Sequence, residues 1–283
     1  MADWSNYWRS PDRPLEAMHA HFERHVYHRH SHETYSFGFT EEGAQSFTCR
    51  GAAHTSAAGM VMAFNPDDPH DGHATNGAGF TYRMLHLGPE LLADVLKDAA
   101  GRPVGLPLFA DPVVADRRLA GRLRGLHEAL LGEATPLRRD ELLDSVVLDL
   151  VGHASHRVPG TRMPAGFPAG PARSDRATAQ VVREMLHDGD DGGISAGDLA
   201  AAAGRSRFAV YRSFHATYGM APSDYQRQLR LRAARRLLAE GRSAAEVAAV
   251  TGFTDQSHLT RWFTRCFGVT PGAYRRAVSD PVS

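Results

Sequence analysis

Short apolar runs alternate with turn signals through the first third of the chain. The segments between them are rich in Gly, Asn, Asp and Pro, as in Asn65-Pro-Asp-Asp-Pro69. These residue types favour tight turns through fixed or left-handed backbone conformations. Several short strands at this spacing predict a small antiparallel β-barrel or sandwich over residues 22–87. The strand-like runs occupy residues 35–39, 45–49, 60–64 and 80–87.

Apolar residues then recur at helical spacing. One helix is predicted over residues 114–131, with its leucines on a single face, and a second over residues 137–153. The two helices either form an antiparallel hairpin that leaves a face for a partner subunit, or they simply cap the strands. The pattern favours neither arrangement.

A stretch rich in Pro, Gly and Ala interrupts this periodicity at residues 158–176. Its four prolines exclude a helix, and nothing in it alternates as a strand does. We therefore predict a linker here, between one domain over residues 1–157 and another over residues 177–278. Residues 279–283 form a short tail.

Beyond the linker the sequence repeats itself. The spacing Phe-x4-Gly-x2-Pro-x2-Tyr occurs twice, from Phe214 to Tyr225 and from Phe263 to Tyr274. An Ala-rich segment that ends in a glycine, Gly204 or Gly252, precedes each copy. A short helix, a glycine in the left-handed conformation and a second helix make a helix-turn-helix. The repeat therefore predicts two such units.

In each unit an N-cap residue, Ser206 or Asp255, marks the start of the second helix. The side chains left on the outward face of that helix are of the types that bind base edges and phosphates. In the first unit they are Arg207, Tyr211, Arg212 and His215, and in the second Gln256, Ser257, His258, Thr260, Arg261 and Thr264.

One helix is predicted between the two units, over residues 222–240. At 1.5 Å per residue it is about 28 Å long, close to the ~34 Å turn of B-DNA. A rod of this length would hold two recognition helices in successive major grooves. Its arginines are expected to supply some phosphate contacts. They are Arg227, Arg230, Arg232, Arg235 and Arg236.

Charge separates the two halves, although the whole chain has a net charge of zero. From Ala177 onward 14 arginines face 10 acidic residues, which leaves the first part with a net charge of about −4. The basic half indicates contact with a polyanion, although solvated surface charge explains the asymmetry equally well.

Other features of composition indicate a cytoplasmic protein without a membrane partner. Two cysteines, Cys49 and Cys266, are too few for a disulfide framework and suit a reducing compartment. No run approaches the roughly 18 apolar residues of a membrane helix. The first residues also lack the pattern of a signal peptide.

The C-terminal half resembles the AraC family of transcription regulators. Gly252-Phe-Thr-Asp-Gln-Ser-His-Leu-Thr-Arg-Trp-Phe263 and the following Phe267-Gly-Val-Thr-Pro-Gly-Ala-Tyr-Arg275 match that family's signature. The resemblance covers residues 177–277. It implies DNA contacts by Phe208, Tyr211, Arg212 and His215 in the first unit, and by Gln256, Ser257, Thr260 and Arg261 in the second. We also include Ser206 and Arg207 in the first set and His258 in the second.

The N-terminal half is similar to the cupin-like ligand-binding domain of many of these regulators. The likeness rests on His30-Ser-His32, Glu42-Gly43, Gly59 and the segment from Asn65 to His70. Together the two resemblances imply an α+β protein, with a cupin-like barrel and helical hairpin followed by an all-α DNA-binding domain. They imply a homodimer through the helices at 114–153. They also imply a small-molecule effector, contact with RNA polymerase, and more often activation than repression.

Histidines crowd the start of the barrel. His28, His30 and His32 alternate, so they share one face of a strand. Three interpretations stay open: the histidines line an effector pocket, hold a metal ion, or only pack. A metal would use His30, His32 and His70, but we expect no cofactor, because the Glu of metal-binding cupins is missing at Ser36 and Phe37. The residues predicted to bind the effector are His30, His32, Tyr35, Phe37, Phe64, His70 and Tyr82.

Two other functions fit the sequence less well than ligand-controlled DNA binding. A metal-dependent dioxygenase fused to a DNA-binding domain would need the missing Glu. DNA alkylation repair would need clustered cysteines, and Cys49 and Cys266 are far apart in the sequence. We therefore expect a protein that is not an enzyme.

Overall fold

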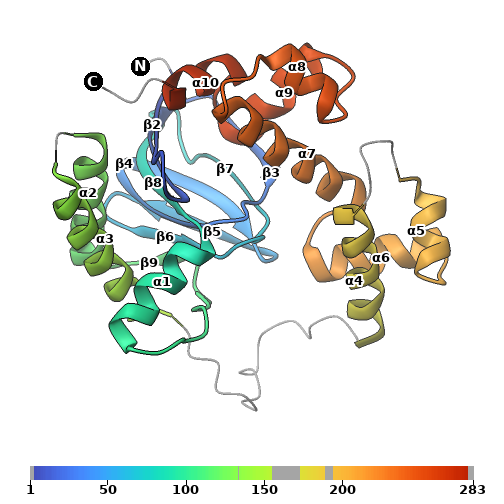
Figure 1. Cartoon of the computed structure of the whole chain (residues 1–283), viewed down its shortest axis with the longest axis horizontal. Helices are drawn as coiled ribbons and strands as arrows, with labels where there is room; N and C mark the ends of the chain where they lie inside the picture. Colours follow the sequence, from blue (N-terminus) through green and yellow to red (C-terminus); the bar gives the residue numbers. More distant parts are fainter. Residues whose placement is uncertain (1–2, 133, 155–172, 189–193, 280–283) are drawn as a thin grey trace. The chain divides into compact units, whose positions relative to one another are not determined.

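The computed structural model describes residues 3–132, 134–154, 173–188 and 194–279. The chain divides into two compact units, one built mainly from residues 1–159 and the other mainly from residues 160–275 (Figure 1). Most of the predicted linker, residues 158–172, lies outside the described residues, as do residues 280–283 of the predicted tail. Residues 173–176 of that linker instead open a helix, because its prolines end at Pro171.

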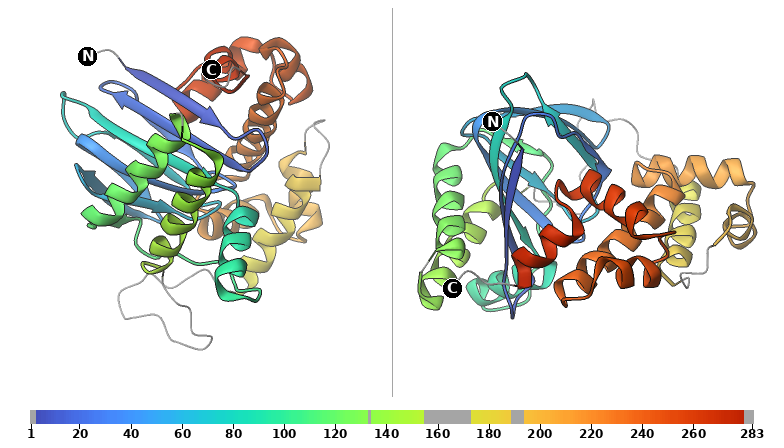
Figure 2. Two further views of the ribbon diagram at one scale, coloured as in Figure 1. Left: turned by 60° about the vertical axis from the view of Figure 1, so that its left-hand side comes forward. Right: turned by 90° about the horizontal axis from the view of Figure 1, so that it is seen from above.

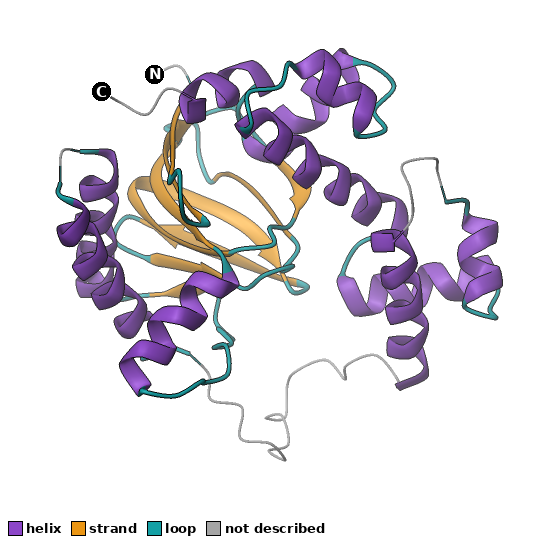
Figure 3. Ribbon diagram, viewed as in Figure 1, coloured by secondary structure: helices purple, strands orange, loops and turns teal. Residues whose placement is uncertain are grey.

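The first unit is a strand-rich sheet with three helices (Figure 3). The strands pair antiparallel in the order β1-β2-β8-β4-β6-β9, while β7 pairs with β3 and β4, and β5 pairs with β4. Among the described residues β1 and β9 are the two ends of this order, so the sheet is open where the sequence predicted a barrel. The strands are β1 (Trp4–Arg9), β2 (Leu15–Phe22), β3 (Tyr27–His30), β4 (Tyr35–Cys49), β5 (Ala52–Ala57), β6 (Val61–Phe64), β7 (His70–Ala74), β8 (Phe80–Leu87) and β9 (Val113–Val114).

Strand β4 joins the two halves of the sheet. Its first part lies between β8 and β6, and its last part lies between β5 and β7. A bulge interrupts its pairing with β8 between Thr40 and Glu42. One extra residue in a strand reverses which face each later side chain takes. The single strand thus combines two runs that the sequence predicted as separate strands.

Two helices, α2 (Arg117–Leu131) and α3 (Pro136–Val151), cover one face of the sheet, as Figure 2 shows. Helix α2 begins three residues later than predicted. The carboxylate of Asp116 accepts hydrogen bonds from the amides of Arg118 and Leu119, at 2.9 and 3.0 Å, and so fixes its start. Val114, the predicted first residue of this helix, belongs to β9. Helix α1 (Pro89–Ala100) and strands β1 and β2 were not predicted.

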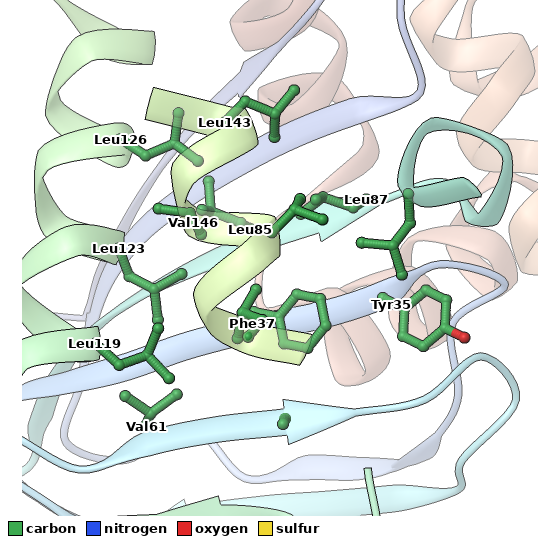
Figure 4. Close-up of a cluster of buried hydrophobic side chains, with 14 of the residues drawn as sticks. Tyr35, Phe37, Val61, Leu85, Leu87, Leu119, Leu123, Leu126, Leu143 and Val146 are labelled. Atoms are coloured by element: carbon green, nitrogen blue, oxygen red, sulfur yellow. The ribbon is translucent and has the colours of Figure 1, made fainter. Parts of the chain in front are cut away.

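The core between sheet and helices is apolar. Leu119, Leu123 and Leu126 from α2 are no more than 2% exposed. They pack with side chains of α3 and with alternate residues of β4 and β8 (Figure 4). Burial of this kind contributes about 25 cal/mol for each Å² of apolar surface removed from water, so it fixes both helices against the sheet.

The second unit is helical and contains both predicted helix-turn-helix units. Its helices are α4 (Arg173–Asp188), α5 (Ala196–Ala202), α6 (Arg207–Tyr218), α7 (Pro222–Ala239), α8 (Ala244–Val250), α9 (Gln256–Phe267) and α10 (Pro271–Ser279). Helices α5 and α6 form the first helix-turn-helix, and α8 and α9 form the second. None of the helices in the described part of the chain is long and apolar enough to cross a membrane.

The structure explains the sequence repeat. Gly204 and Gly252 adopt φ angles of +58° and +71°, the left-handed conformation that lets each first helix end. The Phe and Tyr of each copy pack ring against ring, with centroids 5.4 Å apart for Phe214 and Tyr225 and 5.6 Å for the second pair. Proline begins the helix that carries each Tyr, where its missing N–H costs no hydrogen bond.

Candidate functional site

Helices α6 and α9 carry the predicted DNA-contacting side chains. Each helix begins where predicted: the Ser206 hydroxyl accepts from the amide of Ala209 at 3.2 Å, and the Asp255 carboxylate accepts from the amide of His258 at 2.7 Å. Nine of the eleven predicted residues are exposed, and the other two are half-buried. The exposed residues are Ser206, Arg207, Phe208, Tyr211, Arg212, His215, Gln256, Ser257 and Arg261.

The first recognition helix exposes two large aromatic side chains. Phe208 is 71% exposed and Tyr211 is 49% exposed, and the ring of Tyr211 stacks on His215. An apolar ring left in water contributes nothing to the fold and is available to a partner. Side chains of this kind contact thymine methyl groups in the major groove.

In the second helix-turn-helix, the side chain of His258 makes contacts inside the protein. Its Nε2 accepts a hydrogen bond from the indole N–H of Trp262 at 3.0 Å. Its ring packs edge-to-face on Phe253. His258 and Thr260 are half-buried, whereas Gln256, Ser257 and Arg261 are exposed. These three are therefore the most accessible of the predicted contacts in α9.

Several of the arginines along α7 contact the second helix-turn-helix and hold it in place. Arg227 lies 3.8 Å from the ring centroid of Trp262 in a cation–π contact. Arg230 donates to the carbonyl of Gly252 at 2.9 Å, and Arg235 is 8% exposed and lies over the ring of Tyr274. The sequence predicted phosphate contacts from some of the α7 arginines, and these three have partners within the protein. Arg236 is exposed.

Tyr225 ties the first helix-turn-helix to α7, because its ring packs against that of Phe214 on α6, with centroids 5.4 Å apart. Tyr225 is 2% exposed, and its hydroxyl lies 3.0 Å from Nε of Arg183 and 2.9 Å from Nε2 of His187, both on α4. Helix α7 has 18 residues, which corresponds to about 27 Å. Buried contacts at both ends therefore make α7 a rigid connection between the two helix-turn-helix units.

Three of the predicted effector residues meet in one buried cluster. His30 and His70 are paired across β3 and β7, and His32 follows β3. Candidate ligand nitrogens of the three rings all lie within 4.8 Å of one another. Burial holds the pKa of His30 well below its usual range and lowers the pKa of His70, so both imidazoles are neutral at neutral pH.

A fourth histidine, His86, lies beside this cluster and was not predicted. Its ring centroid is 4.7 Å from that of His32. The period-two pattern of β8 contains the necessary signal, because His86 shares a strand face with Tyr82 and Met84. Tyr82 belongs to the same interior, where its hydroxyl lies 2.7 Å from that of Tyr27. Phe64 stacks on the ring of His70, with centroids 4.1 Å apart.

Tyr35 and Phe37 do not join the other five predicted effector residues. Both lie in the apolar core under α2 and α3, whereas Phe64 and Tyr82 lie in the interior cluster. The physical reason is the register of β4, in which Ser36 pairs with Phe64 and His86 and shares their face, so that Tyr35 and Phe37 take the other face. Before the bulge in β4, odd-numbered residues face the helices and Ser36 faces His86; after the bulge, Phe47 and Cys49 face the interior.

The first unit also contains a cavity of about 1040 Å³ that the sequence did not predict. Side chains of α1, α3 and the segment after α1 line it, and it is mainly apolar. Because α1 was not predicted, no sequence signal pointed to this cavity. Its lining includes Tyr35, Leu96, Arg102, Leu106, Leu108 and Leu148.

Comparison with known proteins finds a matching domain family for each part of the chain. The AraC-like ligand binding domain matches residues 14–147, and a helix-turn-helix domain matches residues 199–277. The chain belongs to the AraC family of transcription regulators. It is a DNA-binding regulator with an AraC-type ligand-binding domain.

Individual relatives agree with this assignment. The chain is 28% identical over 230 residues to an uncharacterized HTH-type transcriptional regulator, YbfI of Bacillus subtilis, covering 81% of this chain and 80% of that protein. It is 43% identical over 98 residues to the transcriptional activator NphR of a Rhodococcus species, covering 34% of this chain and 28% of that protein. An apo variant of ToxT from Vibrio cholerae has the same fold, with a TM-score of 0.58 at 10% identity over 95% of this chain and all of that one.

Proposed function

We propose that this AraC-family regulator activates transcription as a homodimer and reads DNA through the exposed faces of α6 and α9. The observation that carries the proposal is the attachment of both helix-turn-helix units to α7 through buried contacts. Two recognition helices on a rod of about 27 Å match successive major grooves on one face of B-DNA, which are ~34 Å apart.

Arg261 is the sharpest test of the assigned contacts. Its exposed guanidinium fits the two acceptors on the major-groove edge of guanine. We expect Arg261→Ala to weaken binding to the chain's own operator by about 1–3 kcal/mol, with the loss at one base position. The measurement is a gel shift with DNA from upstream of the gene, using every base substitution across the site.

The control is Lys97→Ala, which removes one exposed positive charge from the other unit. It should leave operator affinity unchanged. Equal affinity of Arg261→Ala and wild type for every operator variant would refute the assignment of Arg261.

We place the effector at the interior cluster of His30, His32, His70, Phe64 and Tyr82. Neutral imidazoles and a tyrosine hydroxyl suit a small polar ligand, and the aromatic rings supply apolar contact. A thermal-shift screen of small metabolites against wild type and His32→Gln tests this placement, because a ligand that binds only the folded state raises its melting temperature. A ligand that protects both proteins equally would favour the cavity lined by Tyr35 and Arg102.

The α2–α3 pair is the proposed dimer surface. Leu137 is 70% exposed and Leu148 is 48% exposed, both on α3, and exposed apolar side chains favour a partner subunit. Leu137→Glu should shift the chain toward a monomer in light scattering. Activation implies contact with RNA polymerase, and a DNA-bound regulator works in the cytoplasm. The relatives are regulators, and we assign no catalytic reaction to the chain.

A further inference from the structure

The interior of the first unit holds four buried histidines drawn from separate parts of the fold. His30, His32, His70 and His86 are each no more than 9% exposed. The ring centroid of His30 lies 4.9 Å from that of His32 and 4.5 Å from that of His70. Imidazoles are large polar groups, and a fold that only needed to fill space would bury apolar residues here.

Backbone carbonyls fix the tautomer of two of these rings. Nδ1 of His30 lies 2.7 Å from the carbonyl oxygen of His28, and Nδ1 of His70 lies 2.8 Å from that of Asp68. A carbonyl can only accept, so in both rings Nδ1 must carry the hydrogen. Nε2 of each neutral ring therefore presents its lone pair. A metal-ligating histidine is held in this way, with its other nitrogen donating to a carbonyl or carboxylate.

We propose that His30, His32 and His70 bind one divalent transition-metal ion of the zinc, cobalt and nickel class. His30 and His70 would each contribute Nε2, and His32 one ring nitrogen. The candidate nitrogens lie within 4.8 Å of one another. Bonds of about 2.0–2.1 Å in a tetrahedral site place nitrogens roughly 3.3 Å apart, so small rotations of the rings close the site. Imidazole ligands suit these borderline ions.

The three protein ligands are neutral imidazoles, and their lack of charge determines which fourth ligand the metal ion takes. Ser36 occupies the strand position of the missing carboxylate, and its hydroxyl instead lies 2.8 Å from Nδ1 of His86. Three neutral imidazoles leave the full charge of the ion in a buried site, which is costly without an anion. The fourth position is therefore expected to take hydroxide or an anionic oxygen. An effector at this site would bind as a carboxylate, a consequence that rests on the proposed function.

Binding of Co²⁺ to the full-length protein tests the site without effector or DNA. Zn²⁺ has no visible spectrum, whereas Co²⁺ bound by three imidazoles absorbs in the visible range. After treatment with a chelator and its removal, we expect one equivalent of Co²⁺ to give this band and Zn²⁺ to displace it. His70→Gln and His30→Gln should each weaken Co²⁺ binding by at least ~10–100-fold, the range found for outer-shell changes alone.

The matched control is His73→Gln, three residues from His70 on the same strand but exposed. It should bind Co²⁺ as wild type does. Zn²⁺ should also raise the melting temperature of wild type and His73→Gln but not that of His70→Gln. Absence of the band in wild type, or its retention in both His30→Gln and His70→Gln, would overturn the metal site. Because no DNA is present, either result leaves the regulatory function untouched.

Discussion

His127 on α2 should make the stability of the first unit depend on pH. The side chain is fully buried. Its Nε2 lies 3.0 Å from the carbonyl oxygen of Met18 on β2, and its Nδ1 lies 3.2 Å from a guanidinium nitrogen of Arg83. Nε2 must therefore donate and Nδ1 must accept. Protonation would place a second N–H against a guanidinium that is itself a donor.

The magnitude follows from the pKa of His127. Burial, aided by the charge of Arg83, lowers this pKa to about 4 from a usual value of 6.5, although the hydrogen bond to Met18 opposes the shift. A histidine with a depressed pKa binds its proton mainly in the unfolded state. Its contribution is complete above pH 6.5 and is lost as pH falls toward 4. Between pH 7.5 and pH 5.0 the loss is about 2 kcal/mol.

The assay compares wild type with His127→Gln, whose amide can still donate to the Met18 carbonyl. Both proteins carry Trp262→Phe, so that Trp4 and Trp8 alone report unfolding of the first unit. Urea unfolding at pH 7.5 and pH 5.0 gives the free energy of unfolding of each. We expect the wild type to lose about 2 kcal/mol more than the variant over this interval. Equal losses in the two proteins would refute the reasoning.

Two further predictions concern the second unit. Gly252→Ala should lower its melting temperature more than Gly204→Ala does. Both glycines have positive φ, which costs a substituted residue roughly 1–2 kcal/mol. Of the two, only Gly252 would bring an added Cβ against a neighbour, the Arg230 guanidinium at 3.0 Å. Similar losses of melting temperature in the two variants would show that the Arg230 side chain moves aside freely. Phe208→Ala should change stability by no more than ~0.5 kcal/mol, as expected for an exposed side chain, while it weakens operator binding in a fluorescence-anisotropy titration. Unchanged operator affinity would remove Phe208 from the interface.

Much of the C-terminal unit could be predicted because its signals are local. Glycine at the end of a helix, a capping residue and a proline at a helix start each act within one turn of the chain. The structure confirms the caps at Ser206 and Asp255 and the left-handed glycines. The separate roles of the arginines on α7 could not be predicted, because whether a side chain faces solvent or a neighbouring ring depends on how α9 packs.

The N-terminal unit was less predictable. Strand β2 is buried along most of its length, so it lacks the clean alternation that marks a strand with one wet face. The register of β4 against β6 and β8 is also invisible in the sequence, and this register places Tyr35 and Phe37 on the face under the helices. His86 was missed although it continues the alternation of Tyr82 and Met84 along β8; only its contact with His32 depended on the tertiary structure.

The sequence alone determined the order of the two domains, the paired helix-turn-helix units and the resemblance to the family, because these follow from short-range spacing and backbone preferences. The tertiary structure decided which side chains meet. It brought His30, His32 and His70 together, moved Tyr35 and Phe37 to the opposite face, and gave Arg227 and Arg230 partners inside the protein. The physical reason is that strand pairing and helix packing join residues far apart in the chain, and their geometry is set by the whole core.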